Sequence, residues 1–123
     1  MFFIDGRGTL IKVRTFGNIV IFDIVGSTSD TELTQQNNLE PLLREIEECY
    51  RSNHRQIIIN LEKVLRIDHD TVVKLLMKQS SREGLSIRFY GMQSRVEHAL
   101  KSAGLFSALQ VYQSQRDAVQ SFS

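Results

Sequence analysis

The fold of this chain is decided by residues 57–73, which read Ile-Ile-Ile-Asn-Leu-Glu-Lys-Val-Leu-Arg-Ile-Asp-His-Asp-Thr-Val-Val. An apolar run ends in a polar turn at Glu62 and Lys63, and a second short apolar stretch then leads to Asp68. The residues after Asp68 have the pattern of a helix start. Many α/β domains build their sites where a buried strand delivers polar residues to a helix N-terminus. This stretch therefore predicts an α/β fold with a candidate site around residue 68.

Strands and helices are expected to alternate along the rest of the chain. The apolar pattern predicts strands at residues 8–14, 19–25, 56–61, 85–90 and 109–112. Gly17-Asn18 joins the first two as a hairpin, and the continuous apolar run at 56–61 indicates burial on both faces. The expected order β-β-α-β-α-β-α-β-α predicts an α/β single domain over residues 1–123, with a mixed β-sheet and about four helices.

Four segments are expected to be helices. The second spans residues 70–82, with Val72, Val73, Leu76 and Met77 directed to the core. Ser94 and Ser114 each precede an acid by three residues, so each is expected to cap a helix. The first helix has the clearest pattern, because its apolar residues recur every three or four positions: Leu39, Leu42, Leu43, Ile46, Cys49 and Tyr50. Its acids are expected to form a solvated outer face: Glu40, Glu45, Glu47 and Glu48.

The composition is that of an ordinary globular protein, with 41% hydrophobic and 24% charged residues. The 15 Lys and Arg against 14 Asp and Glu give a net charge of +1. This balance disfavours nucleic acid as a partner, because nucleic-acid binding usually leaves a basic stripe. No apolar run is long enough to span a bilayer, so no membrane insertion is expected. The single cysteine, Cys49, is expected to be inert packing in a cytoplasmic protein.

The chain lacks the usual sequence signatures of catalysis. His54, His69 and His98 are scattered, and no Cys or His pair has metal-ligand spacing. No glycine-rich phosphate loop is present, and no serine has the flanks of a nucleophile elbow. We therefore expect no metal, no cofactor and no enzymatic activity.

The polar residues after residue 65 allow two interpretations. In the first, Asp68 caps the helix, Asp70 stabilises its first turn, and His69 and Thr71 are exposed neighbours without a function. In the second, the same turn is a docking surface for a protein partner. The two are compatible, because a cap can also lie at an interface. The candidate partner-binding residues are Arg66, Asp68, His69, Asp70, Thr71 and Lys74.

Four segments resemble the STAS domains, the family of sulfate transporter and anti-sigma-factor antagonist domains. Residues 19–26 are similar to the family's second strand and its turn, and residues 57–68 to its central strand and motif loop. Residues 84–91 resemble the strand after the second helix, and residues 96–106 the family's Leu-x-x-x-Gly-Leu helix ending. The resemblance implies a STAS-like fold over nearly the whole chain. It also implies a bacterial protein-binding module of signal transduction and transcription regulation.

In this family, antagonists bind a serine-kinase anti-sigma factor. That kinase switches them off by phosphorylating the first Ser of an Asp-Ser-Ser-Gly motif. Asp68 matches the motif Asp, whereas His69 stands at the phosphorylated position, Asp70 at the second Ser and Thr71 at the Gly. The resemblance therefore implies a non-catalytic regulator without the usual phosphorylatable Ser, whose partner is an anti-sigma factor or a similar serine kinase. The family's acid after the second strand falls near Ser29 or Asp30, in the loop 27–30.

The sequence leaves several alternatives open. Asp70 supplies a fixed negative charge near the switch position, which fits either a permanently active or a permanently inactive module. His69 could instead accept phosphate as a phosphocarrier, although Asp68 and Asp70 would repel the phosphate. A further alternative is an accessory subunit of a membrane transporter, since STAS domains also occur there. Thr71 is the nearest hydroxyl for a displaced phosphorylation site, and the oligomeric state is not indicated.

Overall fold

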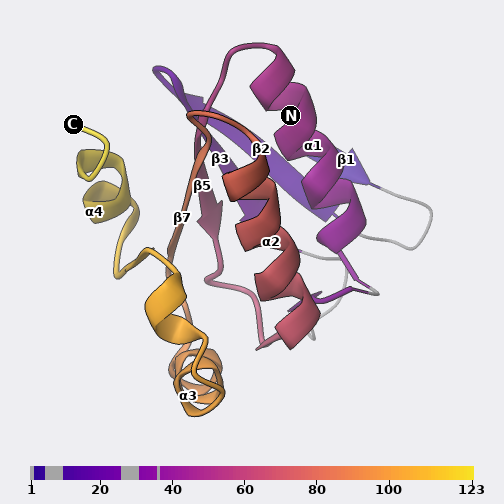
Figure 1. Cartoon of the computed structure of the whole chain (residues 1–123), viewed down its shortest axis with the longest axis vertical. Coiled ribbons are helices and arrows are strands. Elements are labelled where there is room, and N and C mark those ends of the chain that lie inside the picture. Colours follow the sequence, from indigo (N-terminus) through magenta and orange to yellow (C-terminus); the bar gives the residue numbers. More distant parts are fainter. Residues whose placement is uncertain (1, 5–9, 26–30, 36) are drawn as a thin grey trace.

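The computed structural model describes residues 2–4, 10–25, 31–35 and 37–123, and its centre is a six-stranded sheet (Figure 1). The strand order is β1-β2-β3-β5-β7-β8. These strands are β1 (Phe2–Ile4), β2 (Leu10–Phe16), β3 (Ile19–Ile24), β5 (Gln56–Asn60), β7 (Ser86–Tyr90) and β8 (Val111–Tyr112). A separate two-stranded sheet consists of β4 (Glu32–Leu33) and β6 (Arg66–Ile67). The helices are α1 (Leu39–Arg51), α2 (His69–Ser81), α3 (Ser94–Ser102), the short 3-10 helix η1 (Phe106–Ala108) and α4 (Gln115–Gln120).

The large sheet is mixed, as the sequence predicts. β2 and β3 form an antiparallel hairpin around Gly17 and Asn18, and β1 adds to β2 antiparallel. β3, β5, β7 and β8 are all parallel, with Val20 opposite Ile57 and Ile57 opposite Ile87. The predicted order of strands and helices is thus confirmed. The additional strands β1, β4 and β6 were not among the sequence-based expectations.

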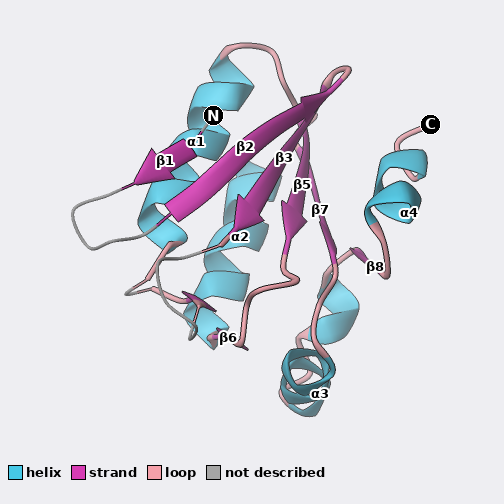
Figure 2. Ribbon diagram, turned by 180° about the vertical axis from the view of Figure 1, so that it is seen from behind, coloured by secondary structure: helices cyan, strands magenta, loops and turns pink. Residues whose placement is uncertain are grey.

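The helices lie on both faces of this sheet. α1 and α2 lie side by side on one face, and the view from behind shows the strands in front of them (Figures 1 and 2). On the opposite face, Ala118 of α4 packs with Ile21, Ile58 and Tyr90. The central strand β5 is therefore covered on both sides, which confirms the burial expected from its continuous apolar run.

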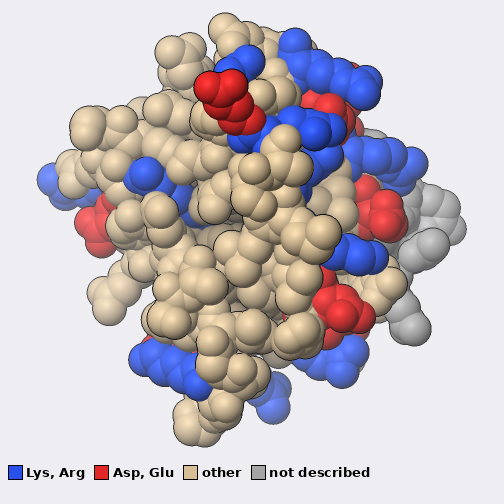
Figure 3. Space-filling view, viewed as in Figure 1, with Lys and Arg blue, Asp and Glu red and all other residues tan. Residues whose placement is uncertain are grey.

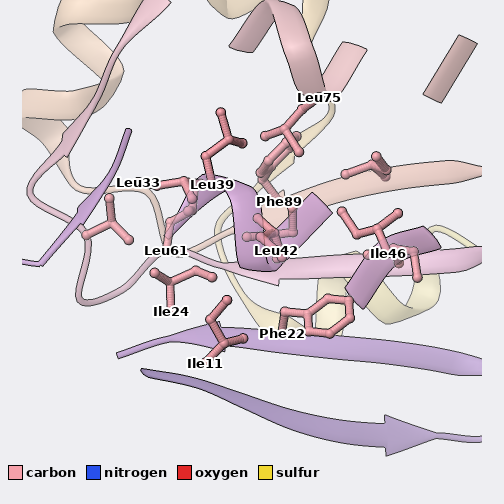
Figure 4. Close-up of a cluster of buried hydrophobic side chains, with 14 of the residues drawn as sticks. Ile11, Phe22, Ile24, Leu33, Leu39, Leu42, Ile46, Leu61, Leu75 and Phe89 are labelled. Carbon is pink, nitrogen blue, oxygen red and sulfur yellow. The ribbon is translucent and has the colours of Figure 1, made fainter. Parts of the chain in front are cut away.

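The main core fills the space between the sheet and the pair α1 and α2. Its side chains point toward one another in Figure 4, with Leu42 and Ile46 from α1, Leu75 from α2, and Phe22 and Phe89 from the sheet. Most of this cluster is fully buried. Each fully buried side chain of this size contributes roughly 1.5–3 kcal/mol, so this interface supplies most of the driving force that holds the two helices on the sheet.

The buried face of α2 differs from the expected one. Val72 and Leu75 are buried, whereas Met77, predicted to face the core, is 62% exposed. Val73 and Leu76 are only partly buried. The reason is that α2 has two neighbours: Val72 packs against α3, while Leu75 joins the main core. Packing from both directions turns the helix away from the face centred on residues 73 and 77.

The two predicted serine caps have different outcomes. Ser114 does cap α4, since its hydroxyl accepts a 3.1 Å hydrogen bond from the N–H of Asp117. Ser94 is instead the first residue of α3, and Gln93 holds the cap position without a side-chain bond to the helix. Nε2 of Gln93 donates to the carbonyl oxygen of Glu62 at 3.0 Å. That contact anchors Gln93 at the helix start, so the predicted cap at Ser94 is wrong.

Candidate protein-binding face at the start of α2

The turn before α2 is held by the small parallel sheet of β4 and β6. Glu32 stands opposite Arg66 and Leu33 opposite Ile67 in this sheet. Just before it, the N–H of Leu65 donates to the carbonyl oxygen of Thr31 at 2.8 Å. Leu33 is fully buried and Ile67 packs against the main core, so these two side chains attach the short sheet to the core. The chain therefore reaches α2 in a fixed conformation.

Asp68 caps α2 and ties it to the neighbouring segment. Oδ1 of Asp68 accepts a 3.0 Å hydrogen bond from the N–H of Thr71 and another from the Thr71 hydroxyl. Oδ2 accepts from the N–H of Gln35 at 3.2 Å. Burial acts to raise the pKa of Asp68, but these hydrogen bonds and the charge of Arg66 outweigh it and lower that pKa. The predicted cap is therefore present, and the Asp68 side chain is occupied within the fold.

Thr71 does not lie on the surface, contrary to the expectation that it is an exposed neighbour. Its side chain is fully buried. The position lies in the first turn of α2 on the inward side, next to Val72, which packs against α3. A threonine fits there because its hydroxyl is satisfied by Asp68. Of the six predicted partner-binding residues, Thr71 is thus the one that the fold removes from the surface.

The exposed part of the turn consists of Arg66, His69 and Asp70. Their side chains are 65%, 67% and 63% exposed. Nδ1 of His69 lies 3.8 Å from Oδ1 of Asp70, and Nε of Arg66 lies 3.5 Å from Oε2 of Glu32. Lys74 is half-buried one turn along α2. These side chains make no contribution to the apolar clusters, so they are available to a partner.

Glu47 of α1 forms a clamp to α2, where the sequence suggested a plain solvated face. Its Oε1 accepts hydrogen bonds from Nζ of Lys78 at 2.6 Å and from Nε of Arg82 at 3.0 Å. The bond from Lys78 is the main reason that the pKa of Glu47 falls to about 2, with Arg82 adding to it. Figure 3 shows the charged side chains of both signs interspersed over α1 and its border with α2. Glu47 is therefore a structural residue, whereas Glu48 remains exposed.

A polar network that the sequence analysis missed lies at the carboxyl ends of three parallel strands. Asp23 of β3, Asn60 of β5 and Tyr90 of β7 stand in one row of the register. Nε of Arg14, from β2, donates to Asp23 at 2.6 Å, and Nδ2 of Asn60 donates to the same carboxylate at 2.7 Å. Arg14 and the Tyr90 hydroxyl also donate to Gln115 of α4. The network thus joins the strands to the last helix.

The chemistry of this network is structural. Burial acts to raise the pKa of Asp23, but the hydrogen bonds from Arg14 and Asn60 outweigh it and lower that pKa. Burial raises the pKa of Tyr90. Both oxygens of Asp23 accept hydrogen bonds from Arg14, so the carboxylate is held in its ionised form. The signal in the sequence is that Asn60 and Tyr90 each end a strand, while Asp23 is the one charged residue within the apolar strand β3.

The remaining sequence expectations concern metals, thiols and membranes. Within the described residues, no three His, Cys, Asp or Glu side chains come together as a metal site. Burial, aided by the charges of Glu45 and Glu48, raises the pKa of Cys49 to about 11, as expected of an unreactive packed thiol. No helix in the described ranges has the length and apolar character to cross a membrane. Ser29, Asp30 and the rest of the loop 27–30 lie outside the described residues.

Comparison with known proteins relates the fold to anti-sigma-factor antagonists. No family model and no curated protein matches the sequence. Among solved structures, an anti-sigma factor antagonist from Mycobacterium paratuberculosis is similar with a TM-score of 0.73 at 12% identity, covering 97% of each chain. An anti-sigma-factor antagonist (STAS) domain protein from Planctomyces limnophilus has a TM-score of 0.70 at 10% identity, covering 90% of this chain and 96% of that one.

A membrane protein contains the same fold. The mouse anion transporter Solute Carrier 26 family member A9 is similar with a TM-score of 0.64 at 18% identity, over 87% of this chain but only 18% of the transporter. Identities this low establish the fold alone. The chain therefore has the STAS fold, as its sequence resemblance implied.

Proposed function

We propose that this chain is a non-catalytic protein-binding module of the anti-sigma-factor antagonist type. Its partner, an anti-sigma factor or a similar serine kinase, docks on the turn formed by residues 66–70. The fold similarity to anti-sigma factor antagonists supports the class of function. The geometry of the turn supports the location of the interface.

One observation carries the location. The turn is fixed on both sides, by the pairing of β4 with β6 and by the Asp68 cap, yet it exposes His69 and Asp70, which no part of the core requires. A rigid polar projection of this kind loses little conformational entropy on binding. Recognition residues are commonly presented in this way by loops on a rigid scaffold.

The regulation we propose differs from a serine switch. His69 stands where the resembling family has the phosphorylated Ser, and the adjacent Asp70 carries a permanent negative charge. The nearest hydroxyl, that of Thr71, is buried and hydrogen-bonded to Asp68. Binding is therefore set by the amounts of the two proteins, without phosphorylation of this turn.

The test is to identify the partner by a photo-crosslinking residue at position 69 and then to measure its affinity for purified variants. We expect His69→Ala and Asp70→Ala to weaken binding while the unfolding transition stays unchanged. Glu48→Ala is the matched control, because the Glu48 side chain is 68% exposed on α1, close to the exposure of the Asp70 side chain. Equal affinity of all three variants and the parent would contradict the location of the interface.

The transporter likeness favours a second candidate partner. A STAS-fold segment makes up part of the mouse anion transporter, so the same turn could serve as an accessory docking surface on a membrane protein. The two candidates differ in the partner and not in the binding residues. The crosslinked protein recovered at position 69 distinguishes them directly.

A further inference from the structure

A groove runs between β6 and α3, beside the turn at the start of α2. It encloses about 900 Å³, including the open space above it. Its apolar lining comes from Leu65 and Ile67 on one side and from Val96 and Ala99 on the other. Val96 is buried and packs with Val72 of α2, so this wall is part of the folded core. An apolar side chain could therefore enter the groove against a firm surface.

Two arginines also line the groove. Arg66 contributes from β6 and Arg95 from the first turn of α3, while Glu32 is the single acid among the described residues that line it. Arg66 forms an exposed ion pair with Glu32 at 3.5 Å, a contact of the kind that contributes little to stability. Arg95 is exposed, and no carboxylate of the described residues lies within ion-pair distance of it. The groove thus has an excess of positive charge above an apolar floor.

We infer that this groove binds an acidic segment of the protein partner. An apolar side chain of that segment enters between Ile67 and Val96, and a neighbouring carboxylate binds Arg95. The guanidinium group matches a carboxylate with two parallel hydrogen bonds, which a solvent-exposed arginine without an internal partner is free to make. This inference rests on the proposed function, because the groove adjoins the docking turn through Arg66, and it adds the chemistry of the segment that is recognised.

The apolar floor and the mixed rim favour a protein segment. A nucleic-acid strand would need several phosphate contacts along a basic track, whereas here Glu32 stands beside Arg66. An acidic amphipathic segment matches both parts of the groove: its apolar side chain packs on the apolar floor, and its carboxylates bind the arginines at the rim. Interfaces of this type concentrate their binding energy in a few arginine and apolar anchors.

The experiment uses the full chain and an arrayed set of short peptides as probes. Each peptide has a central Leu or Phe with acidic, neutral or basic flanks. We expect the acidic-flanked peptides to bind best, and Arg95→Glu to reduce their affinity by about tenfold or more, the size expected when a charge-assisted hydrogen bond is lost. Arg95→Glu should also raise the affinity of the basic-flanked peptides. A glutamate is favourable in the first turn of α3, so this variant should remain folded.

Two further variants define the site. Ala99→Phe fills the groove from an exposed position on α3 and should abolish peptide binding. Arg116→Glu changes an exposed arginine at the start of α4 and should leave binding unchanged. No preference for acidic flanks would overturn the inference. So would acidic-flanked binding that survives both Arg95→Glu and Ala99→Phe, or a second copy of the chain that occupies the groove and excludes the peptides.

The outcome also separates this inference from the proposed function. A crosslinked partner that depends on His69 and Asp70 but not on Arg95 would leave the proposed function intact and overturn the groove as its binding site. A partner that depends on all three would support both. A partner insensitive to all three would contradict both.

Discussion

Oδ1 of Asp68 accepts hydrogen bonds from both the backbone N–H and the hydroxyl of Thr71. The four polar residues from Asp68 to Thr71 therefore separate into two layers. Thr71 is buried, and the partly buried Asp68 fixes the helix start. His69 and Asp70 lie on the outside. The capping role thus falls on Asp68, and the proposed docking role concerns His69 and Asp70.

Removal of the cap should weaken the fold without abolishing it. Asp68→Ala leaves the N–H of Thr71 and the buried Thr71 hydroxyl without their acceptor, and we expect the free energy of unfolding to fall by about 1–2 kcal/mol. Urea denaturation followed by circular dichroism measures this change. Asp70→Ala removes an exposed carboxylate two residues further along the chain. It should lower the free energy of unfolding by at most a few tenths of a kcal/mol. Equal losses in the two variants would contradict the structural role of Asp68.

Thr71 should carry no phosphate in the native protein. Its hydroxyl is fully buried and donates to a carboxylate, so a kinase could reach it only after local unfolding of the first turn of α2. Mass spectrometry of the protein from its native cells, with phosphatase inhibitors present, tests this expectation. Stoichiometric phosphate on Thr71 would mean that the regulatory position has moved two residues along the turn.

The clamp between α1 and α2 should make stability depend on acid. The pKa of Glu47 is about 2 in the folded protein and 4.5 for the unperturbed group. A lowered folded pKa means that the ionised form stabilises the protein fully above about pH 4.5. This contribution is then lost as the pH falls toward about 2. Glu47→Gln should therefore be less stable than the parent at pH 7 and equally stable near pH 2.

Thermal unfolding of the parent and Glu47→Gln across this pH range provides the measurement. Glu48→Gln is the control, since the Glu48 side chain is exposed and its ion pair to Arg51, at 3.8 Å, lies within its own helix. The stability difference between Glu48→Gln and the parent should be small and nearly independent of pH. A difference for Glu47→Gln that persists at pH 2 would show that packing, and not charge, is responsible.

The buried centre of the sheet should not tolerate a charge. Ile58 is fully buried on the face that α4 covers, and Ile58→Asp must either protonate its carboxyl or leave it without a partner there. We expect a loss of more than about 3 kcal/mol. Met77→Asp places the same side chain at a position that is 62% exposed and should cost far less. Cooperative melting of Ile58→Asp near the parent temperature would contradict the position of β5 in the sheet.

The sequence predicts an element well where the spacing of its apolar residues fits only one type of structure and one buried face. The first helix has its apolar residues at strict helical spacing from Leu39 onward, and the structure buries Leu39, Leu42 and Ile46. In α2, by contrast, nearly every position from Val72 to Met77 is apolar, so spacing alone does not define the inward face. The packing of α3 against Val72 and of the main core against Leu75 selects it.

Contacts between distant segments were beyond the reach of pattern analysis. β4 and β6 have two residues each, too few for an alternating pattern to be recognised. Their pairing depends on the tertiary fold, which brings residues 32–33 beside residues 66–67. The bond from Arg14 to Asp23 likewise depends on the hairpin register, and the bond from Asn60 to Asp23 on the parallel register of β3 and β5. The candidate turn was found because its residues are adjacent in sequence. The network was missed because its residues are not.

The short turn at Gly17 and Asn18 also has a kinetic consequence. Thr15 pairs with Val20 across a very small loop. The pairing of Val20 with Ile57 instead closes a long loop that contains the whole of α1. Closing a small loop costs less entropy than closing a large one, so this hairpin should form early and the parallel pairs late. Weakening the hairpin by Thr15→Gly should therefore slow refolding. Val111→Ala, in the edge strand β8, should mainly accelerate unfolding, and stopped-flow measurement of both rates distinguishes the two effects.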